Sequence, residues 1–201
     1  MKAVVFDIGN VLLRWDPHLA FLPELGCRAA VDDFLARVDF YAWNLENDRG
    51  RSLGEALAAI DDPADRAILA RYGERFHLTV REPIAGTWVL LERLQARGIA
   101  LHAITNWSAE LWPVGVGVHP RLGEVFGVTV VSGVEGLIKP DPRIYATLCE
   151  RAGLAAADCL FIDDSRANAE GARAFGMQAH HFTEPALLEA ELNERGLLGH
   201  E

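Results

Sequence analysis

The sequence predicts an α/β protein with a doubly wound parallel sheet and an inserted helical lobe. Short apolar runs, such as residues 3–6 and 160–162, alternate with stretches whose apolar residues recur at helical spacing. Strands that alternate with helices favour a parallel sheet with right-handed crossovers. From Asp16 to about Pro83 only the helical spacing continues. The 201 residues suffice for one sheet domain and a small lobe.

Residues 3–6 predict the central strand, because they form a short run rich in β-branched side chains that suits burial on both faces. Asp7 follows at once, and Gly9 and Asn10 are a turn signal. An acidic side chain therefore stands at the carboxyl end of a strand, where open α/β sheets place their ligand crevice. These residues alone fit equally well an Asp that only accepts hydrogen bonds from turn amides.

The helical spacing predicts a cap domain over residues 15–83, inserted into a core domain of residues 1–14 and 84–201. Ser52 and Glu55 have the spacing of a capping box. Arg49 belongs to a polar and aromatic cluster in this lobe, and its guanidinium is a candidate to bind a substrate phosphate or carboxylate. A solvated helix end explains the same cluster. Its other members are Trp43, Asn44, Glu46 and Arg51.

The α/β alternation resumes after the insertion. Gly98 and Gly176 follow apolar helical patterns and predict helix ends. The expected helices span residues 84–97, 141–152, 167–175 and 185–195, and the expected strands span 99–105, 128–132, 160–163 and 178–182.

Composition narrows the classes of partner. The formal charge of −10 comes without a basic tract, which argues against nucleic acid. No apolar run approaches the roughly eighteen residues of a membrane span, and the first residues do not resemble a signal peptide. The three cysteines are odd in number and lack a C-x-x-C spacing, which favours reduced thiols and the cytoplasm. The oligomeric state stays open between a monomer and a homodimer.

Polar residues follow three further predicted strands or the loops after them. These are Thr105 with Asn106, Lys139, and Asp163 with Asp164. The carboxyl ends of parallel strands meet at one edge of the sheet, so these side chains can converge on Asp7. Each residue alone also fits a helix cap or a surface pair.

The acidic members of this set predict a metal site. Crowded carboxylates resist ionisation unless a cation lies between them. Asp7 and Asp164, assisted by Asp163, offer the hard oxygen ligands that suit Mg²⁺. Lys139 can offset the remaining charge and hold an anion, while Thr105 can donate to phosphate oxygens. Asn106 can donate in the same way. A carboxylate placed in such an anion clamp can attack phosphorus and form an aspartyl-phosphate.

The ordered set resembles the four motifs of the haloacid dehalogenase (HAD-like) hydrolase superfamily. The matching segments are residues 6–11, 104–106, 139–145 and 161–165, and residues 168–176 resemble the helix after the fourth motif. The resemblance implies a Rossmannoid core with a mobile helical cap. It implies that Asp7 is the nucleophile and a Mg²⁺ ligand, with Asp164 as the other main carboxylate. It also implies that Thr105 and Lys139 bind phosphate.

One position departs from the family pattern. Family phosphatases carry a second Asp, a general acid and base, two residues after the nucleophile, and here that position is Gly9. The Gly9 carbonyl can still bind the metal. Sugar or acyl phosphates, with better leaving groups, suffer least from the missing proton donor, and members with this Gly-Asn-Val variant resemble small sugar-phosphate phosphatases. Asp16 and His18 are candidate replacements, or else they only start a helix.

Two other functions fit the motifs. A metal-independent 2-haloacid dehalogenase needs no leaving-group acid, and Lys139 and Tyr145 match the spacing of that branch. That branch does not need the Asp163–Asp164 pair, which favours a metal and hence phosphate. A non-catalytic protein that binds a phosphorylated ligand is the remaining alternative. The expected function is Mg²⁺-dependent hydrolysis of a small phosphomonoester, such as a sugar phosphate, through an aspartyl-phosphate on Asp7.

Overall fold

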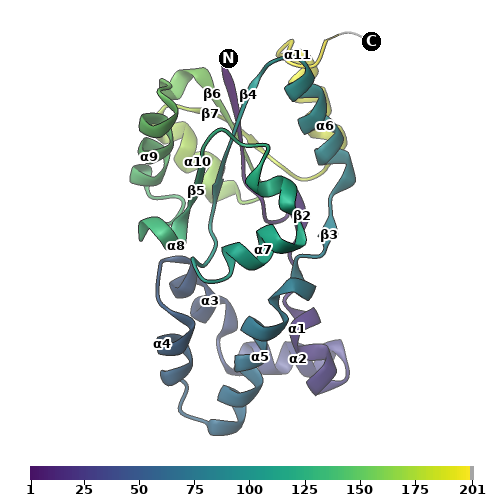
Figure 1. Ribbon diagram of the computed structural model, residues 1–201, viewed down its shortest axis with the longest axis vertical. Helices are drawn as coiled ribbons and strands as arrows, with labels where there is room; N and C mark the ends of the chain where they lie inside the picture. Colours follow the sequence, from purple (N-terminus) through teal and green to yellow (C-terminus); the bar gives the residue numbers. More distant parts are fainter. Residues whose placement is uncertain (200–201) are drawn as a thin grey trace.

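The computed structural model describes residues 1–199 and contains a five-stranded parallel sheet (Figure 1). The strand order is β5-β4-β1-β6-β7, so the first strand of the chain lies at the centre, as predicted. In β1, Val5 lies opposite His102 on one side and Phe161 on the other. The strands are β1 Ala3–Phe6, β4 Ala100–Thr105, β5 Thr129–Val131, β6 Cys159–Asp163 and β7 Gln178–His181.

Helices cover both faces of the sheet, which confirms the doubly wound architecture (Figure 1). Val4 and Phe6 belong to the apolar cluster that includes α6 and α11, whereas Ala3 and Val5 belong to the cluster of α9 and α10. This alternation follows from the two-residue period of a strand. These helices are α6 Ala85–Ala96, α9 Pro142–Ala152, α10 Arg166–Phe175 and α11 Pro185–Glu194.

A helical lobe lies beyond the carboxyl ends of the strands (Figure 1). Its interior is aromatic, with the Phe40 ring 5.7 Å from Phe21 and 5.0 Å from Tyr72 between centroids. The predicted capping box of Ser52 and Glu55 is present. An antiparallel pair of short strands, β2 Leu13–Arg14 and β3 Glu82–Pro83, joins the lobe to the sheet domain. The lobe consists of α1 His18–Leu25, α2 Arg28–Arg37, α3 Phe40–Asp48, α4 Leu53–Ala58 and α5 Pro63–Thr79.

Several short elements differ from the sequence expectations. The strand β3 lies at the end of the interval in which only helices were expected. The helix α7 contains two glycines, and glycine disfavours helix formation. A Cβ on Gly115 would lie 2.7 Å from the Trp107 ring, so the close packing of this ring explains the glycine. Besides β2 and β3, the elements that the sequence did not predict are α7 Trp112–Val118, α8 Ser132–Glu135, η1 Pro120–Gly123 and η2 Ala156–Asp158.

Two compositional expectations have structural counterparts. All three cysteines, Cys27, Cys149 and Cys159, are free thiols. None of the helices formed by residues 1–199 combines the length and the apolar character that a membrane span requires.

Candidate active site

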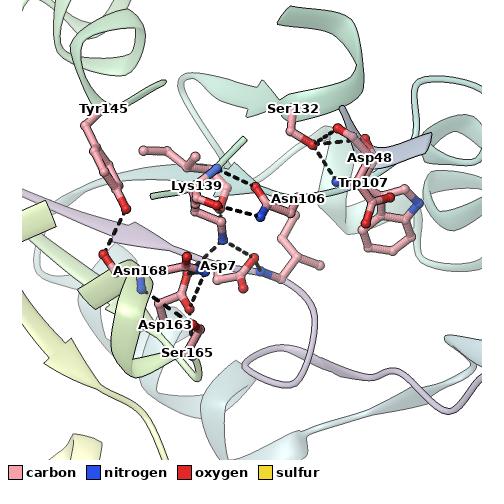
Figure 2. A network of polar contacts seen from close by, with 12 residues as sticks. Asp7, Asp48, Asn106, Trp107, Ser132, Lys139, Tyr145, Asp163, Ser165 and Asn168 are labelled. Carbon is pink, nitrogen blue, oxygen red and sulfur yellow. Dashed lines mark hydrogen bonds and ion pairs between the residues drawn. The ribbon is translucent and has the colours of Figure 1, made fainter. Parts of the chain in front are cut away.

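Lys139 joins three of the predicted segments at the carboxyl edge of the sheet (Figure 2). Its Nζ lies 2.9 Å from Asp7 Oδ1 and 2.7 Å from Asp163 Oδ2. The same ammonium donates a hydrogen bond of 3.0 Å to the carbonyl of Ile104, near the end of β4. Lys139 is 3% exposed. The predicted convergence of Asp7, Lys139 and Asp163 is therefore present as a buried ion-pair cluster.

Both oxygens of Asp163 are held by hydrogen bonds. Oδ1 accepts from the backbone N–H of Ser165 at 2.8 Å, and the Asn168 side-chain amide lies 3.1 Å from Oδ1 and 3.2 Å from Oδ2. Ser165 is the N-cap of α10, so the start of this helix fixes the carboxylate. The Tyr145 hydroxyl donates to the Asn168 carbonyl at 2.8 Å. Asp163 thus has a fixed orientation beside Lys139.

Asp7 has one oxygen engaged and one free of hydrogen bonds. Oδ1 accepts from the Ile8 N–H at 2.7 Å and contacts the Lys139 ammonium. Within residues 1–199, Oδ2 has no hydrogen-bond partner, and Asp7 lines a cavity. An oriented carboxylate with one available oxygen is the arrangement that a nucleophile requires.

Asp7, Asp163 and Asp164 can each offer one oxygen, and these three atoms lie within 4.8 Å of one another. Burial raises the pKa of Asp7 to about 7; Lys139 opposes this rise, while Asp163 and Asp164 add to it. Burial and the charge of Asp163 also raise the pKa of Asp164. A hard divalent cation would relieve this repulsion, and its preferred ligands are carboxylate oxygens. The donor set therefore fits Mg²⁺.

Lys139 is positioned through its backbone as well as its ammonium. Asn106 accepts from the Lys139 N–H at 2.9 Å and donates to the Lys139 carbonyl at 3.3 Å. Burial alone would lower the pKa of Lys139, but the carboxylates of Asp163 and Asp7 raise it above its ordinary value. The lysine is therefore charged. Asn106 also lines the cavity, whereas Thr105 is buried at the end of β4 and is not among the lining residues.

A cavity of about 480 Å³ lies between the lobe and the sheet domain. The floor includes Asp7 and Asp164, and the lobe contributes mainly aromatic and aliphatic side chains. Trp107 lines the cavity and packs against Phe76 at a centroid distance of 5.4 Å. The lining residues are Asp7, Gly9, Asn10, Trp15, Tyr41, Ala42, Asn44, Leu45, Asp48, Tyr72, Phe76, Val80, Asn106, Trp107, Leu111, Asp164 and Asn168.

The structure does not bring Arg49 to this cavity. Its side chain is half exposed and lies 3.8 Å from Glu46 on the outside of α3. Arg51 instead donates to Asn47 Oδ1 and to the Trp43 carbonyl. Neither arginine is among the residues that line the cavity, so this arrangement gives no support to the expectation that Arg49 meets the substrate.

Asp16 and His18 also lie outside the cavity lining. The Asp16 carboxylate accepts from the His18 N–H at the start of α1 and pairs with Arg28. The His18 ring contacts Asp32 through Nε2 at 2.6 Å. This arrangement matches the alternative interpretation, in which Asp16 and His18 only start a helix.

Sequence reasoning missed Asp48, Asn10 and Asn168 as cavity residues. For Asp48, the sequence holds one indication: it lies four residues after Asn44, which places both residues on the same face of a helix. In the structure, Asn44 Nδ2 donates a hydrogen bond to Asp48 Oδ2 at 2.9 Å. Nothing in the local sequence indicates that this face turns toward Asp7.

Comparison with known proteins identifies the family. A family model described as haloacid dehalogenase-like hydrolase matches residues 1–176. The chain belongs to the haloacid dehalogenase-like hydrolases. This confirms the resemblance carried by the four motifs, while the link between the Gly-Asn-Val segment and sugar-phosphate phosphatases stays a prediction.

Curated relatives of this hydrolase are phosphatases, which supports phosphatase activity. The sesquiterpene phosphatase astK of Aspergillus oryzae is 26% identical over 200 residues, covering 96% of this chain and 95% of the relative. A phosphoglycolate phosphatase of Thiobacillus denitrificans is 30% identical over 185 residues, covering 88% and 80%. A phosphoserine phosphatase of Thermus thermophilus is 28% identical over 223 residues, covering 89% and 87%.

Solved structures of low sequence identity share the fold of this hydrolase. A HAD family enzyme from Bacteroides thetaiotaomicron, in complex with magnesium and inorganic phosphate, has a TM-score of 0.67 at 20% identity, with 91% of this chain and 94% of that chain covered. The L-2-haloacid dehalogenase from Xanthobacter autotrophicus has a TM-score of 0.63 at 19% identity, with 96% and 83% covered. Both likenesses show a shared fold.

Proposed function

We propose that this hydrolase is a Mg²⁺-dependent phosphatase that cleaves small phosphomonoesters through an aspartyl-phosphate on Asp7. The observation that carries the proposal is the available Oδ2 of Asp7, which belongs to a cluster of three carboxylates beside the buried Lys139. A 2-haloacid dehalogenase needs no such cluster. The phosphatase names of the curated relatives support the same reaction class.

Asp7, Asp164 and the Gly9 carbonyl would hold the metal, with Asp163 orienting Lys139 and completing the acidic set. When bound, Mg²⁺ would offset the charge of the phosphate and of the surrounding carboxylates. Lys139 would bind a phosphate oxygen, and the Asn106 amide and Thr105 hydroxyl are the further donors proposed at the end of β4. The free thiols fit the reducing cytoplasm predicted from the sequence.

Residues 15–83 would act as a mobile cap over the core of residues 1–14 and 84–201. The short β2–β3 pair is the connection about which the lobe would move, because both crossings between the lobe and the core run through it. Closure would exclude water from the cavity and place the lobe residues against the substrate.

A release assay with and without Mg²⁺ tests the proposal. Phosphate esters, including sugar phosphates, are assayed for inorganic phosphate and 2-haloacids for halide, with the Asp7→Asn variant as the blank. Phosphate release that requires both Mg²⁺ and Asp7 is the expected result. Metal-independent halide release would establish dehalogenation instead. Release of neither phosphate nor halide would favour a protein that binds a phosphorylated ligand without turnover.

The cavity lining argues against the dehalogenase. A 2-haloacid brings a carboxylate beside the reacting carbon, and that group needs a cation or several donors. Among residues 1–199, no arginine or histidine lines the cavity.

A further inference from the structure

A phosphomonoester with an alkyl leaving group needs a proton donor near Asp7. The departing alkoxide is a strong base, and protonation by a positioned acid is worth about 10²- to 10⁴-fold in rate. The segment directly after Asp7 does not supply one. Gly9 has no side chain, and a Cβ placed there would meet no atom within 4 Å. The donor must therefore come from elsewhere in the cavity wall.

The described cavity wall contains few titratable side chains. Asp7 and Asp164 serve as nucleophile and metal ligand in the proposed function. The Tyr72 hydroxyl accepts a hydrogen bond from the Trp15 indole at 3.2 Å, and burial raises its pKa well above the ordinary value, so it is a poor acid. Tyr41 is a weaker candidate than a buried group, because its side chain is 57% exposed to solvent. Asp48 is the remaining candidate.

The end of α3 holds Asp48 in the wall. One carboxylate oxygen accepts from the Asn44 side chain at 2.9 Å, and the Ser108 N–H also donates to this carboxylate. The Ser132 hydroxyl donates to the Asp48 carbonyl at 2.5 Å, and the oxygen of that hydroxyl accepts from the Trp107 N–H at 2.8 Å (Figure 2). Docking of the lobe on the loops after β4 and β5 therefore delivers this carboxyl group to the cavity.

The surroundings of Asp48 favour a group that can both give and take a proton near neutral pH. Burial raises its pKa to about 7, while the Ser108 N–H and the charge of Lys139 oppose the rise. Tyr72 is the other titratable group that faces it. The adjacent Arg49, the C-cap of α3, has Glu46 as its ion-pair partner. A carboxyl group in this range matches the requirement for general acid–base catalysis.

We propose, resting on the phosphatase function above, that Asp48 is the general acid and base of this site. As the bond from Asp7 oxygen to phosphorus forms and the bond from phosphorus to the ester oxygen breaks, Asp48 gives its proton to that ester oxygen and the alcohol leaves. The Asp48 carboxylate then takes a proton from the water that attacks the phosphorus of the aspartyl-phosphate. Inorganic phosphate leaves, and both Asp7 and protonated Asp48 are regenerated.

The test compares two esters of similar shape, p-nitrophenyl phosphate and p-nitrobenzyl phosphate, in the full-length protein with Mg²⁺. The first has a weakly basic leaving group that needs little protonation, and the second leaves as an alkoxide. Because kcat/KM covers the steps up to alcohol release, Asp48→Asn should lower it about 10²-fold or more for the benzyl ester and less than about 5-fold for the phenyl ester. Asp48→Glu, which keeps the acid, should recover part of the loss.

Glu46→Gln is the matched control, because Glu46 is an exposed carboxylate of the same helix outside the cavity lining. It should leave both values unchanged. An equal loss for both esters in Asp48→Asn, or no loss for either, would overturn the role of Asp48, and thermal melting of each variant detects misfolding. If the wild-type protein turns over neither ester in an Asp7-dependent way, the proposed phosphatase function fails, and this assignment fails with it.

Discussion

Replacing Lys139 by Met would leave two buried carboxylates without their shared cation. Met fills a similar volume, so the change isolates the charge and its contacts with Asp7, Asp163 and the Ile104 carbonyl. Removing one partner of a buried ion pair costs about 3–5 kcal/mol. In a chain of this size, each kcal/mol lowers the melting temperature by about 2–4 °C. We therefore expect a decrease of about 6–20 °C at pH 8 without divalent metal.

The same variant should recover part of its stability in acid. The pKa of Asp7 is raised to about 7 even with Lys139 present, and loss of the cation raises it further. A carboxyl group with a raised pKa in the folded state stabilises the fold below its unfolded pKa, and this contribution is lost as the pH rises through the folded pKa. The deficit relative to wild type should hence be smaller at pH 5 than at pH 8.

Differential scanning calorimetry at both pH values, with and without Mg²⁺, measures these differences. The chain's other lysine gives a matched control: Lys2 pairs with Asp158 and its side chain is 69% exposed, so Lys2→Met should leave the melting temperature unchanged. A Lys139→Met protein that melts within about 2 °C of wild type at pH 8 without metal, less than about 1 kcal/mol, would refute the reasoning.

Three further outcomes are expected. Gly133→Ala should destabilise the protein by about 1–3 kcal/mol in urea titrations, because the added Cβ would lie 2.5 Å from the Ala109 nitrogen. Gly54→Ala is the control and should not destabilise the protein, because a Cβ on Gly54 would meet no atom within 4 Å. Asp48→Asn should melt higher than wild type at pH 8 but not at pH 4, since ionisation of a carboxyl group whose pKa is about 7 opposes folding as the pH rises; equal differences at both pH values would contradict this. Chelation of divalent metal should abolish phosphate release, and Asp164→Asn should raise the Mg²⁺ concentration for half-maximal activity more than about tenfold; an unchanged Mg²⁺ requirement would exclude Asp164 as a ligand.

The core of the site was predictable because sheet topology alone brings strand ends together. Asp7 directly follows β1, Asp163 is the last residue of β6, and Lys139 lies in the connection after β5. Parallel pairing of β1 with β4 and β6 aligns the ends of these strands. No lobe contact is needed to place them. The local signals for the sheet domain, namely apolar runs and glycine helix ends, are likewise short in range.

The lobe residues were not predictable, because their placement depends on which helix face docks. Asp48 and Arg49 are adjacent in sequence, but they lie on different sides of the end of α3. Asp48 shares the inward face with Asn44, whereas Arg49 shares the outward face with Glu46. Chemistry alone favoured the arginine as the substrate contact, and only the docked lobe shows that the aspartate lines the cavity.

A single-turnover reaction quenched in acid tests the central claim most directly. The wild-type protein is mixed with p-nitrophenyl phosphate and Mg²⁺, quenched during turnover, digested and analysed by mass spectrometry. The account predicts a phosphoryl group on the peptide that contains Asp7, absent without Mg²⁺ and released by hydroxylamine. Phosphate release with an unmodified Asp7 peptide, together with full turnover by Asp7→Asn, would contradict it.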